Sequence, residues 1–316
     1  MTATETETPE MSRAKAWLIA TRPQTMPAAA APVIVGVGLA YSAGVFSLGP
    51  AVAALVGAAL IQIGTNLAND YYDAVKGVDS EERQGFTRVT NSGLIPAEQV
   101  KRGMILTFAA AMLVGTYLVY VGGLPILVIG LASIVSGYAY AGGPVPLGSH
   151  GLGDLFDFVF FGVIAVVGTF YVQAAAVLAD PLAMTIPEGT ITTTALLASL
   201  PIAGISTNIL VVNNIRDLET DREAGKVSLA VLLGYRWSRV EFTGLLAIAY
   251  AVPLYFFATG EFGGAILLPF LSLPYAALLA RTVLTRTDGD ALNPALERTG
   301  KLLAGFAVLF ALGMVI

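Results

Sequence analysis

The chain of 316 residues contains no cysteine and a single histidine, His150. Without cysteine, disulfides, thiolate metal sites and cysteine nucleophiles are all excluded. One histidine cannot build a histidine-based metal site, and His150 lies in a glycine-rich stretch that is typical of a solvated loop. A metal site in this chain would therefore have to rely on oxygen ligands.

Charged residues are scarce as well. They make up 12% of the chain, against about 25% in a typical soluble domain, whereas 56% of the residues are hydrophobic. Several apolar runs reach the roughly 20 residues that a membrane-spanning helix needs. We therefore expect an all-α, polytopic membrane protein with about nine transmembrane helices. The runs lie near 27–46, 51–72, 104–122, 124–142, 156–178, 195–214, 242–260, 262–280 and 299–316.

Lysine and arginine are absent from every second loop between these runs. Because cytoplasmic loops carry the excess of basic residues, we expect the N-terminus and the basic loops to be cytoplasmic and the C-terminus to be outside. The acidic, threonine-rich start lacks a basic region of the kind a signal peptide has, so we expect residues 1–14 to be a disordered cytoplasmic tail and 15–316 to form the membrane domain. The net charge of −5 is spread over a few loops, and we expect no nucleic-acid partner. The loops without lysine or arginine lie near 47–50, 121–125, 179–194 and 259–263.

An acidic stretch, NLANDYYDAVKGVD, ends the second apolar run at residues 66–79. Asn66, Asp70 and Asp73 follow one another at spacings of four and three, so they share one face of a helix end. Carboxylates at a bilayer are costly unless they bind a cation or line a polar cavity. We interpret this stretch as half of the functional site.

A second such stretch, NNIRDLETDREAGK, ends the sixth run at residues 213–226. Asn213, Asp217 and Asp221 repeat every four residues along one helix face. The two stretches lie four helices apart, a spacing that indicates an internal repeat. Repeats are also common in transporters, so repetition alone does not decide the function.

Basic residues accompany both acidic stretches. Mg²⁺ usually joins a few carboxylates to substrate phosphates, and lysine and arginine are the donors that a diphosphate requires. With an apolar cavity beneath them in the membrane, these groups predict a site for a prenyl diphosphate. The alternative, that basic residues only set the topology, is favoured for Lys101, Arg102, Arg236 and Arg239. The residues beside the acidic groups are Lys76, Arg83, Arg88, Arg216, Arg222 and Lys226.

The two acidic stretches resemble the two aspartate-rich motifs of the UbiA superfamily of intramembrane aromatic prenyltransferases, and the likeness covers essentially the whole chain after the tail. The resemblance implies a helical bundle around a central cavity, with Mg²⁺ and a polyprenyl diphosphate bound at its cytoplasmic face. The third acidic position comes late, at Asp79, where a water-mediated role or a pairing with Lys76 is the alternative to direct ligation. The resemblance implies as metal ligands Asn69, Asp70, Asp73, Asp79, Asp217 and Asp221, and as catalytic residues Lys76, Arg83, Arg88 and Lys226.

Other polar residues are candidates for binding the substrates. From their spacing, Asn66 and Asn213 are further oxygen donors beside the metal. Arg22 is placed to contact the acceptor's carboxylate or hydroxyls, or else it anchors the first helix at the membrane surface. Asp154 either serves the acceptor or caps a helix. The remaining candidates are Tyr140, a cavity wall residue or a membrane-interface tyrosine, and Arg216 for the diphosphate.

Three further segments resemble the menaquinone-pathway branch of the superfamily, namely 21–36, 75–79 and 140–162. This branch transfers a polyprenyl group to 1,4-dihydroxy-2-naphthoate with loss of carbon dioxide, giving demethylmenaquinone. The alternatives are another branch with a 4-hydroxybenzoate or digeranylgeranylglyceryl phosphate acceptor, and, from other classes, a cation-coupled transporter or a cation channel. A transporter explains poorly why the acidic residues lie at helix ends, and a channel needs no clustered lysine and arginine.

Overall fold

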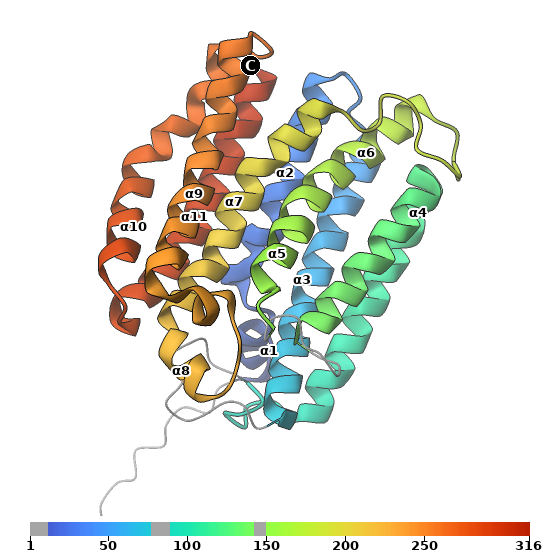
Figure 1. The fold of residues 1–316 in the computed structure, drawn as a ribbon. Coiled ribbons are helices and arrows are strands. Elements are labelled where there is room, and N and C mark those ends of the chain that lie inside the picture. Colours follow the sequence, from blue (N-terminus) through green and yellow to red (C-terminus); the bar gives the residue numbers. More distant parts are fainter. Residues whose placement is uncertain (1–11, 77–88, 142–149) are drawn as a thin grey trace, which may run out of the picture.

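The computed structural model describes residues 12–76, 89–141 and 150–316. In these ranges the chain is helical, with one isolated bridge between His150 and Val227. The helices run side by side in a single bundle (Figure 1). They are α1 Arg13–Thr21, η1 Pro23–Thr25, α2 Met26–Ser42, α3 Leu48–Lys76, α4 Ala97–Ala141, α5 Gly153–Asp157, η3 Phe158–Ile164, α6 Ala165–Leu178, α7 Thr193–Arg216, α8 Leu218–Glu223, α9 Leu229–Thr259, η4 Gly264–Ser272, α10 Leu273–Thr285 and α11 Gly289–Val315.

Within the described part of the chain, 8 helical segments are long and apolar enough to cross a membrane. The longest, α4, is two helices joined at Gly123, whose backbone is not helical. Gly103 in the first half lies against Leu67, and Gly137 in the second half lies against Thr65. Because both halves contact the same turn of α3, α4 folds back on itself as a hairpin. The expected all-α membrane architecture is confirmed, and the nine expected helices are these segments with α4 counted twice.

The turn inside α4 requires glycine. Gly123 has φ 69° and ψ −158°, a conformation that is essentially restricted to glycine, and a Cβ atom there would overlap the carbonyl oxygen of Ala183. The amide of Leu124 donates to that same oxygen at 2.9 Å, and the amide of Leu182 donates to the oxygen of Tyr120 at 2.9 Å. The loop between α6 and α7 is thus fastened to the tip of the α4 hairpin.

The centre of the bundle is formed by α2, α7, α9 and α11. Of the spans, α7 is the most buried and α4 the least, and the most extensive helix contacts join α3 to α4, α7 to α9, and α2 to α11. Phe242, Phe256, Phe306 and Phe310 are fully buried in this core. Small residues bring helices close, as membrane helices require: a Cβ atom on Gly36 would lie 2.7 Å from Cβ of Thr169.

Two helices begin well before the apolar runs indicate. The expected spans near 242–260 and 299–316 belong to α9 and α11, which start at Leu229 and Gly289. In α11, charged residues lower the hydrophobicity of the first turns without breaking the helix, whereas α9 is two helices joined at Gly234, whose backbone is not helical. Ser12 caps α1 by accepting a hydrogen bond from the amide of Lys15 at 3.4 Å. Most of the expected tail, 1–14, lies outside the described residues, so its limits stay a prediction.

Candidate functional site

The first acidic stretch continues α3 as a helix to Lys76. Asp70 is 1% exposed. Its Oδ2 accepts a hydrogen bond from the amide of Val89 at 3.0 Å, and its Oδ1 accepts one from the amide of Thr90 at 3.0 Å. These bonds satisfy a buried carboxylate and hold it against the start of the segment before α4. A carboxylate has about four lone-pair positions, so both oxygens can still accept a further contact.

One turn earlier, Asn66 joins α3 to the connection between α1 and α2. Its Nδ2 donates to the carbonyl oxygen of Thr21 at 3.0 Å and to Oγ1 of Thr25 at 2.8 Å, and Nε2 of Gln62 donates to the same Oγ1 at 3.2 Å. The connection carries Arg22, which is buried and has φ 50°. Asn66 thereby positions the backbone around Arg22, and its expected contact with a metal or substrate stays a prediction.

Other expected residues of the first stretch are partly exposed. Asn69 makes no side-chain hydrogen bond within the described chain, so its amide is available to a ligand, and Asp73 lies one turn further along the same helix. The hydroxyl of Tyr72 donates to that of Tyr138 at 2.6 Å, which links α3 to the second half of α4. Outside the described residues lie Asp79, Arg83 and Arg88, and also the side chains of Lys76 and Tyr140.

The second acidic stretch spans the end of α7 and the short helix α8. Asp217 sits at the break with φ −92° and ψ 7°. The amide of Asp217 donates to the oxygen of Asn213 at 3.0 Å, and the amide of Asp221 donates to the oxygen of Asp217 at 2.7 Å. These bonds keep the spacing of four residues across the break, so the three side chains stay in helical register.

Arg216 is the centre of a polar cluster at this end. Its Nε and Nη2 donate to the two carboxylate oxygens of Asp217 at 2.7 and 2.6 Å, which is the strong bidentate geometry. Nη2 also donates to Oδ1 of Asn213 at 2.9 Å, and Nη1 donates to Oδ1 of Asn293 on α11 at 2.7 Å. The side chain of Arg216 is only 4% exposed, so it orients Asp217 and ties α7 to α11.

Asp221 has a separate basic partner. Nζ of Lys226 lies 2.8 Å from its Oδ2, and Lys226 is also close enough to Asp154 to interact electrostatically. Asp154 is buried at the start of α5, where Nδ2 of Asn214 donates to its two oxygens at 3.3 and 3.2 Å. Asp154 therefore lies beside the second acidic stretch, because both of these partners, Asn214 and Lys226, belong to that stretch.

Two further carboxylates lie deeper, and the sequence analysis missed them. Asp157 accepts a hydrogen bond from Oγ1 of Thr207 at 3.3 Å, and both Asp157 and Glu241 interact electrostatically with Asp154. The signal that marks Asp157 is an acidic residue inside an apolar run, which is costly in a membrane and typical of a functional position. Glu241 directly precedes the run at 242–260 and has no such signal. Asp157 also directly precedes the π-helical segment η3, a feature that is frequent at functional sites.

The donor set fits a metal that is shared with a substrate. Among the described residues, no three histidine, cysteine, aspartate or glutamate side chains are close enough to hold a metal ion by themselves. Mg²⁺ does not need such a cage, because it keeps several waters and is bound through one or two carboxylates plus substrate phosphates. Asp70 at one helix end and Asp217 and Asp221 at the other offer this kind of partial ligand set.

Comparison with known proteins decides the family. The model of the UbiA prenyltransferase family matches residues 29–313. The chain belongs to the UbiA prenyltransferase family. It is 37% identical to the 1,4-dihydroxy-2-naphthoate octaprenyltransferase of Escherichia coli (strain K12), over 96% of each chain. It is 32% identical to the enzyme of the same description from Mycobacterium tuberculosis, over 93% of this chain and 95% of the relative.

Solved structures of UbiA homologues have the same fold. An apo homologue from Aeropyrum pernix K1 matches with a TM-score of 0.64 at 15% identity, over 90% of this chain and 95% of that one. A homologue from Archaeoglobus fulgidus bound to DMAPP and Mg²⁺ matches with a TM-score of 0.59 at 17% identity, over 93% and 98%. The expected family and the expected UbiA-like helical bundle are both confirmed.

In this member of the UbiA family, the chemistry concentrates at one end of the bundle. The ends of α3 and α7, with α1 and α8, lie together at the end opposite the C-terminus (Figure 1). Buried carboxylates with basic partners there suit binding of a polyanion through a cation. The apolar helices behind them suit a prenyl chain, which is consistent with a prenyltransferase.

Proposed function

We propose that this chain transfers a polyprenyl group from its diphosphate to 1,4-dihydroxy-2-naphthoate, giving demethylmenaquinone. The allylic C–O bond breaks with release of diphosphate, a C–C bond forms at the ring carbon that bears the carboxylate, and the carboxyl group leaves as carbon dioxide. The observation that carries this proposal is the nearly full-length similarity to relatives described as 1,4-dihydroxy-2-naphthoate octaprenyltransferases.

The two acidic helix ends are proposed to receive the diphosphate with Mg²⁺. A bound Mg²⁺ neutralises part of the charge that develops on the leaving diphosphate. The Archaeoglobus fulgidus homologue, which binds DMAPP and Mg²⁺, supports this assignment, as does the burial of Asp70, Asp217 and Asp221. The proposed ligands are Asn69, Asp70, Asp73, Asp79, Asp217 and Asp221.

The basic residues divide into two roles. Arg216 makes bonds to three neighbouring side chains, so we assign it the positioning of Asp217 and, through Nη1, the docking of α11. Lys226 has one carboxylate partner and is less buried, so it would be free to turn to a phosphate oxygen if a cation took its place beside the buried Asp221. Together with Lys76, Arg83 and Arg88, it is proposed to stabilise the departing diphosphate.

The acceptor is proposed to bind beside Asp154. This buried carboxylate is held by Asn214 and is suited to accept a hydrogen bond from a naphthoate hydroxyl. Arg22 and Tyr140 complete the proposed acceptor side, with Asp157 and Glu241 beneath Asp154. Exclusion of water by the surrounding helices protects the allylic cation, which then reacts with the electron-rich ring.

The proposed orientation has the N-terminus and both acidic stretches in the cytoplasm and the C-terminus outside. The distribution of lysine and arginine supports it: the loops at 43–47, 179–192 and 260–263 contain none, and the C-terminus lies at the end of the bundle opposite α1 and α8 (Figure 1). With this orientation, residues 1–14 form a cytoplasmic tail and 15–316 the membrane domain.

Parallel reactions with two acceptors test the proposal. Purified protein is incubated with a long-chain prenyl diphosphate, with or without Mg²⁺, and with either 1,4-dihydroxy-2-naphthoate or 4-hydroxybenzoate, and the products are identified by mass spectrometry. We expect a prenylated, decarboxylated naphthoquinol that forms only with Mg²⁺. Prenylated hydroxybenzoate as the sole product would contradict the acceptor, and turnover without any divalent metal would contradict the metal site.

A further inference from the structure

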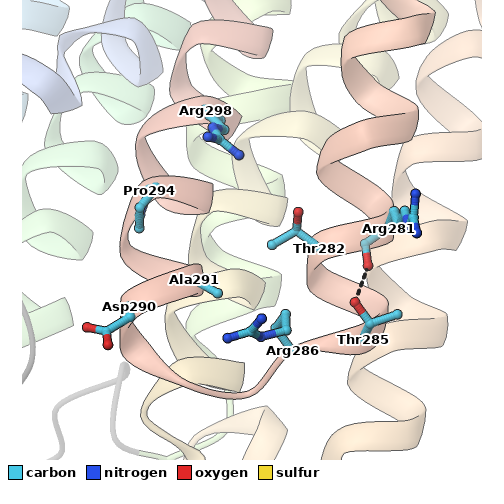
Figure 2. Close-up of a pocket in the computed structure, with 8 residues that line it drawn as sticks. All are labelled: Arg281, Thr282, Thr285, Arg286, Asp290, Ala291, Pro294 and Arg298. Carbon is cyan, nitrogen blue, oxygen red and sulfur yellow. Dashed lines mark hydrogen bonds between the residues drawn. The ribbon is translucent and has the colours of Figure 1, made fainter.

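A cavity of about 370 Å³ lies between α10 and α11, close to the loop that joins them (Figure 2). It is separate from the two acidic stretches and contains none of the residues assigned to prenyl transfer. Three of the side chains around it are arginines, which is unusual for the edge of an apolar bundle. The lining residues are Arg281, Thr282, Thr285, Arg286, Asp290, Ala291, Pro294 and Arg298.

The arginines give this cavity a net positive charge. Arg281 and Arg298 are exposed and make no ion pair or side-chain hydrogen bond with the rest of the described chain, while Nε of Arg286 lies 2.7 Å from Oδ2 of Asp288. Figure 2 shows Arg286 and Arg298 pointing into the space between the helices and Asp290 pointing away from it. The Arg281 side chain points away from that space in Figure 2, so the guanidinium groups that face it are those of Arg298 and Arg286. Arg298 has no ion pair within the described chain, and the nitrogen atoms of Arg286 other than Nε can still donate to an anion.

A second cavity, of about 310 Å³, lies along the same two helices on the side away from the loop, since its lining residues continue η4–α10 and α11 beyond those of the first. It is lined by Ser272, Tyr275, Lys301, Leu302 and Gly305. From Arg298 to Gly305 α11 rises by about 10 Å, so this part of the groove lies deeper in the membrane. The groove therefore has an arginine-rich end at the membrane surface and a largely apolar continuation toward the bilayer centre.

The groove also opens to lipid. Leu271 and Leu278 on the η4–α10 segment are 71% and 66% exposed, and α10 is at the edge of the bundle (Figure 1). An apolar face of this kind on a membrane helix is covered by acyl chains. Phospholipids of the bilayer are therefore always present beside the groove and could contact both its arginine-rich end and its apolar part. A soluble anion would contact only the arginine-rich end of the groove.

We propose that the groove between α10 and α11 binds an anionic phospholipid. The phosphate headgroup would be held by Arg286 and Arg298, which face the groove (Figure 2), and one acyl chain would lie along Tyr275 and Gly305. Guanidinium groups bind phosphate oxygens in bidentate pairs, and basic pockets between transmembrane helices on the cytoplasmic side are suited to anionic head groups. The net positive charge selects an anionic lipid over a zwitterionic one.

Lipid binding by the purified full-length chain tests this proposal. Native mass spectrometry in a neutral detergent would measure retention of phosphatidylglycerol and of phosphatidylcholine with the same acyl chains, with inorganic phosphate as a soluble competitor. We expect phosphatidylglycerol to be retained preferentially and millimolar phosphate not to displace it. Equal retention of the two lipids, or full displacement by phosphate, would overturn the proposal.

Variants locate the site. The double variant Arg286→Gln/Arg298→Gln should bind phosphatidylglycerol about 30-fold more weakly, because each basic residue near the membrane surface contributes about 1 kcal/mol. The matched control Lys101→Gln/Arg102→Gln removes two basic residues on α4, a helix without extensive contacts to α10 or α11, and should bind like the unmodified protein. An equal loss in both double variants would contradict a site between α10 and α11.

A third variant covers the case in which the charge variant does not fold. A Cβ atom on Gly305 would meet nothing within 4 Å, so Gly305→Leu fills the apolar part of the groove without removing charge. We expect it to weaken phosphatidylglycerol retention while the melting temperature in lipid-free detergent is preserved. Unchanged retention in this variant would contradict the placement of the acyl chain.

Discussion

Each buried carboxylate of the proposed site is stabilised in a different way. Asp70 accepts two backbone amides, Asp217 forms a bidentate pair with Arg216, and Asp221 pairs with Lys226. An unpaired buried charge would be strongly destabilising, so these partners let the acidic groups exist at the helix ends before any cation arrives. The pairs also tie Asp217 and Asp221 to basic partners, so the effect of replacing a carboxylate on turnover has to be measured together with its effect on folding.

Replacing either of two central carboxylates measures both effects at the residue scale. Asp70→Asn or Asp217→Asn should lower kcat at least about 100-fold, because charge stabilisation by a metal is worth several kcal/mol. Activity would be measured at increasing Mg²⁺, and folding by gel filtration in detergent. The matched control Asp180→Asn changes an exposed aspartate in the loop after α6 and should be silent. Near-normal activity of Asp217→Asn at high Mg²⁺ would refute its role as a ligand.

Arg216 offers a more specific prediction. Arg216→Lys keeps the charge but loses the bidentate bond to Asp217 and the bond to Asn293, so we expect the Mg²⁺ concentration for half-maximal activity to rise about 10–100-fold. Arg222→Lys alters an arginine whose pair with Glu219 is half exposed, and it serves as the control. An Arg216→Lys enzyme with unchanged Mg²⁺ dependence would show that Arg216 does not position a metal ligand.

At this scale, the sequence predicts side chains at regular spacings but not their partners. The spacing of four between Asn213, Asp217 and Asp221 survives the break after α7. The pairing of Arg216 with its immediate neighbour Asp217 was not predictable, because it depends on the break itself, which turns the two side chains toward each other. Asp157 was not predicted because it lies inside an apolar run, away from the two acidic helix ends, and Glu241 was not predicted because it follows Arg236 and Arg239 in a stretch that resembles a basic loop.

Among the elements, the α4 hairpin depends most on a single residue. Gly123→Ala should lower the free energy of unfolding by about 1–3 kcal/mol, since the conformation at Gly123 is one that only glycine readily adopts and the added Cβ would overlap the oxygen of Ala183. The melting temperature in detergent measures this effect. Gly115→Ala, in the same helix with nothing within 4 Å, should be neutral or slightly stabilising. Equal melting temperatures for the two variants would contradict the hairpin.

The positions of the helices were predictable where hydrophobicity alone determines where a helix begins and ends. The glycine pair at 122–123 indicated the turn between two spans, and the structure places the turn there. The first turns of α11 were missed because a hydropathy argument ends at charged residues such as Glu297, whereas a helix tolerates them at the membrane surface. The start of α9 was missed because its short apolar first part is separated from the main run by the break at Gly234 and by Arg236. Pro253 and Pro294 lie inside helices, as membrane helices allow.

For the whole molecule, orientation in the membrane is the property that joins the site to its substrates. The chain lacks cysteine, so a thiol reagent labels only the single cysteine that a variant introduces. In intact cells, a membrane-impermeant maleimide should label Glu188→Cys, in the loop before α7, and should label Thr287→Cys, in the loop before α11, only after permeabilisation. Both positions are exposed. The reverse pattern would place the acidic stretches outside the cell.

The contacts through which the helices assemble could not be predicted from the sequence. Two acidic helix ends four spans apart implied one site, yet the bonds that join them to the bundle run through α11 and the α1–α2 connection. Asn293 and Thr25 supply these bonds, and neither belongs to the two acidic stretches. Contacts between distant helices depend on packing shape, which a pattern of hydrophobicity does not record.

The coupled stoichiometry of the reaction tests the central claim most directly. A 1,4-dihydroxy-2-naphthoate labelled in its carboxyl carbon is incubated with a polyprenyl diphosphate and the purified protein, and labelled carbon dioxide and diphosphate are counted together. The proposed function predicts equal amounts of both for each prenylated product, and neither without Mg²⁺. Diphosphate released without labelled carbon dioxide, or no release of either with folded protein and Mg²⁺ present, would contradict it.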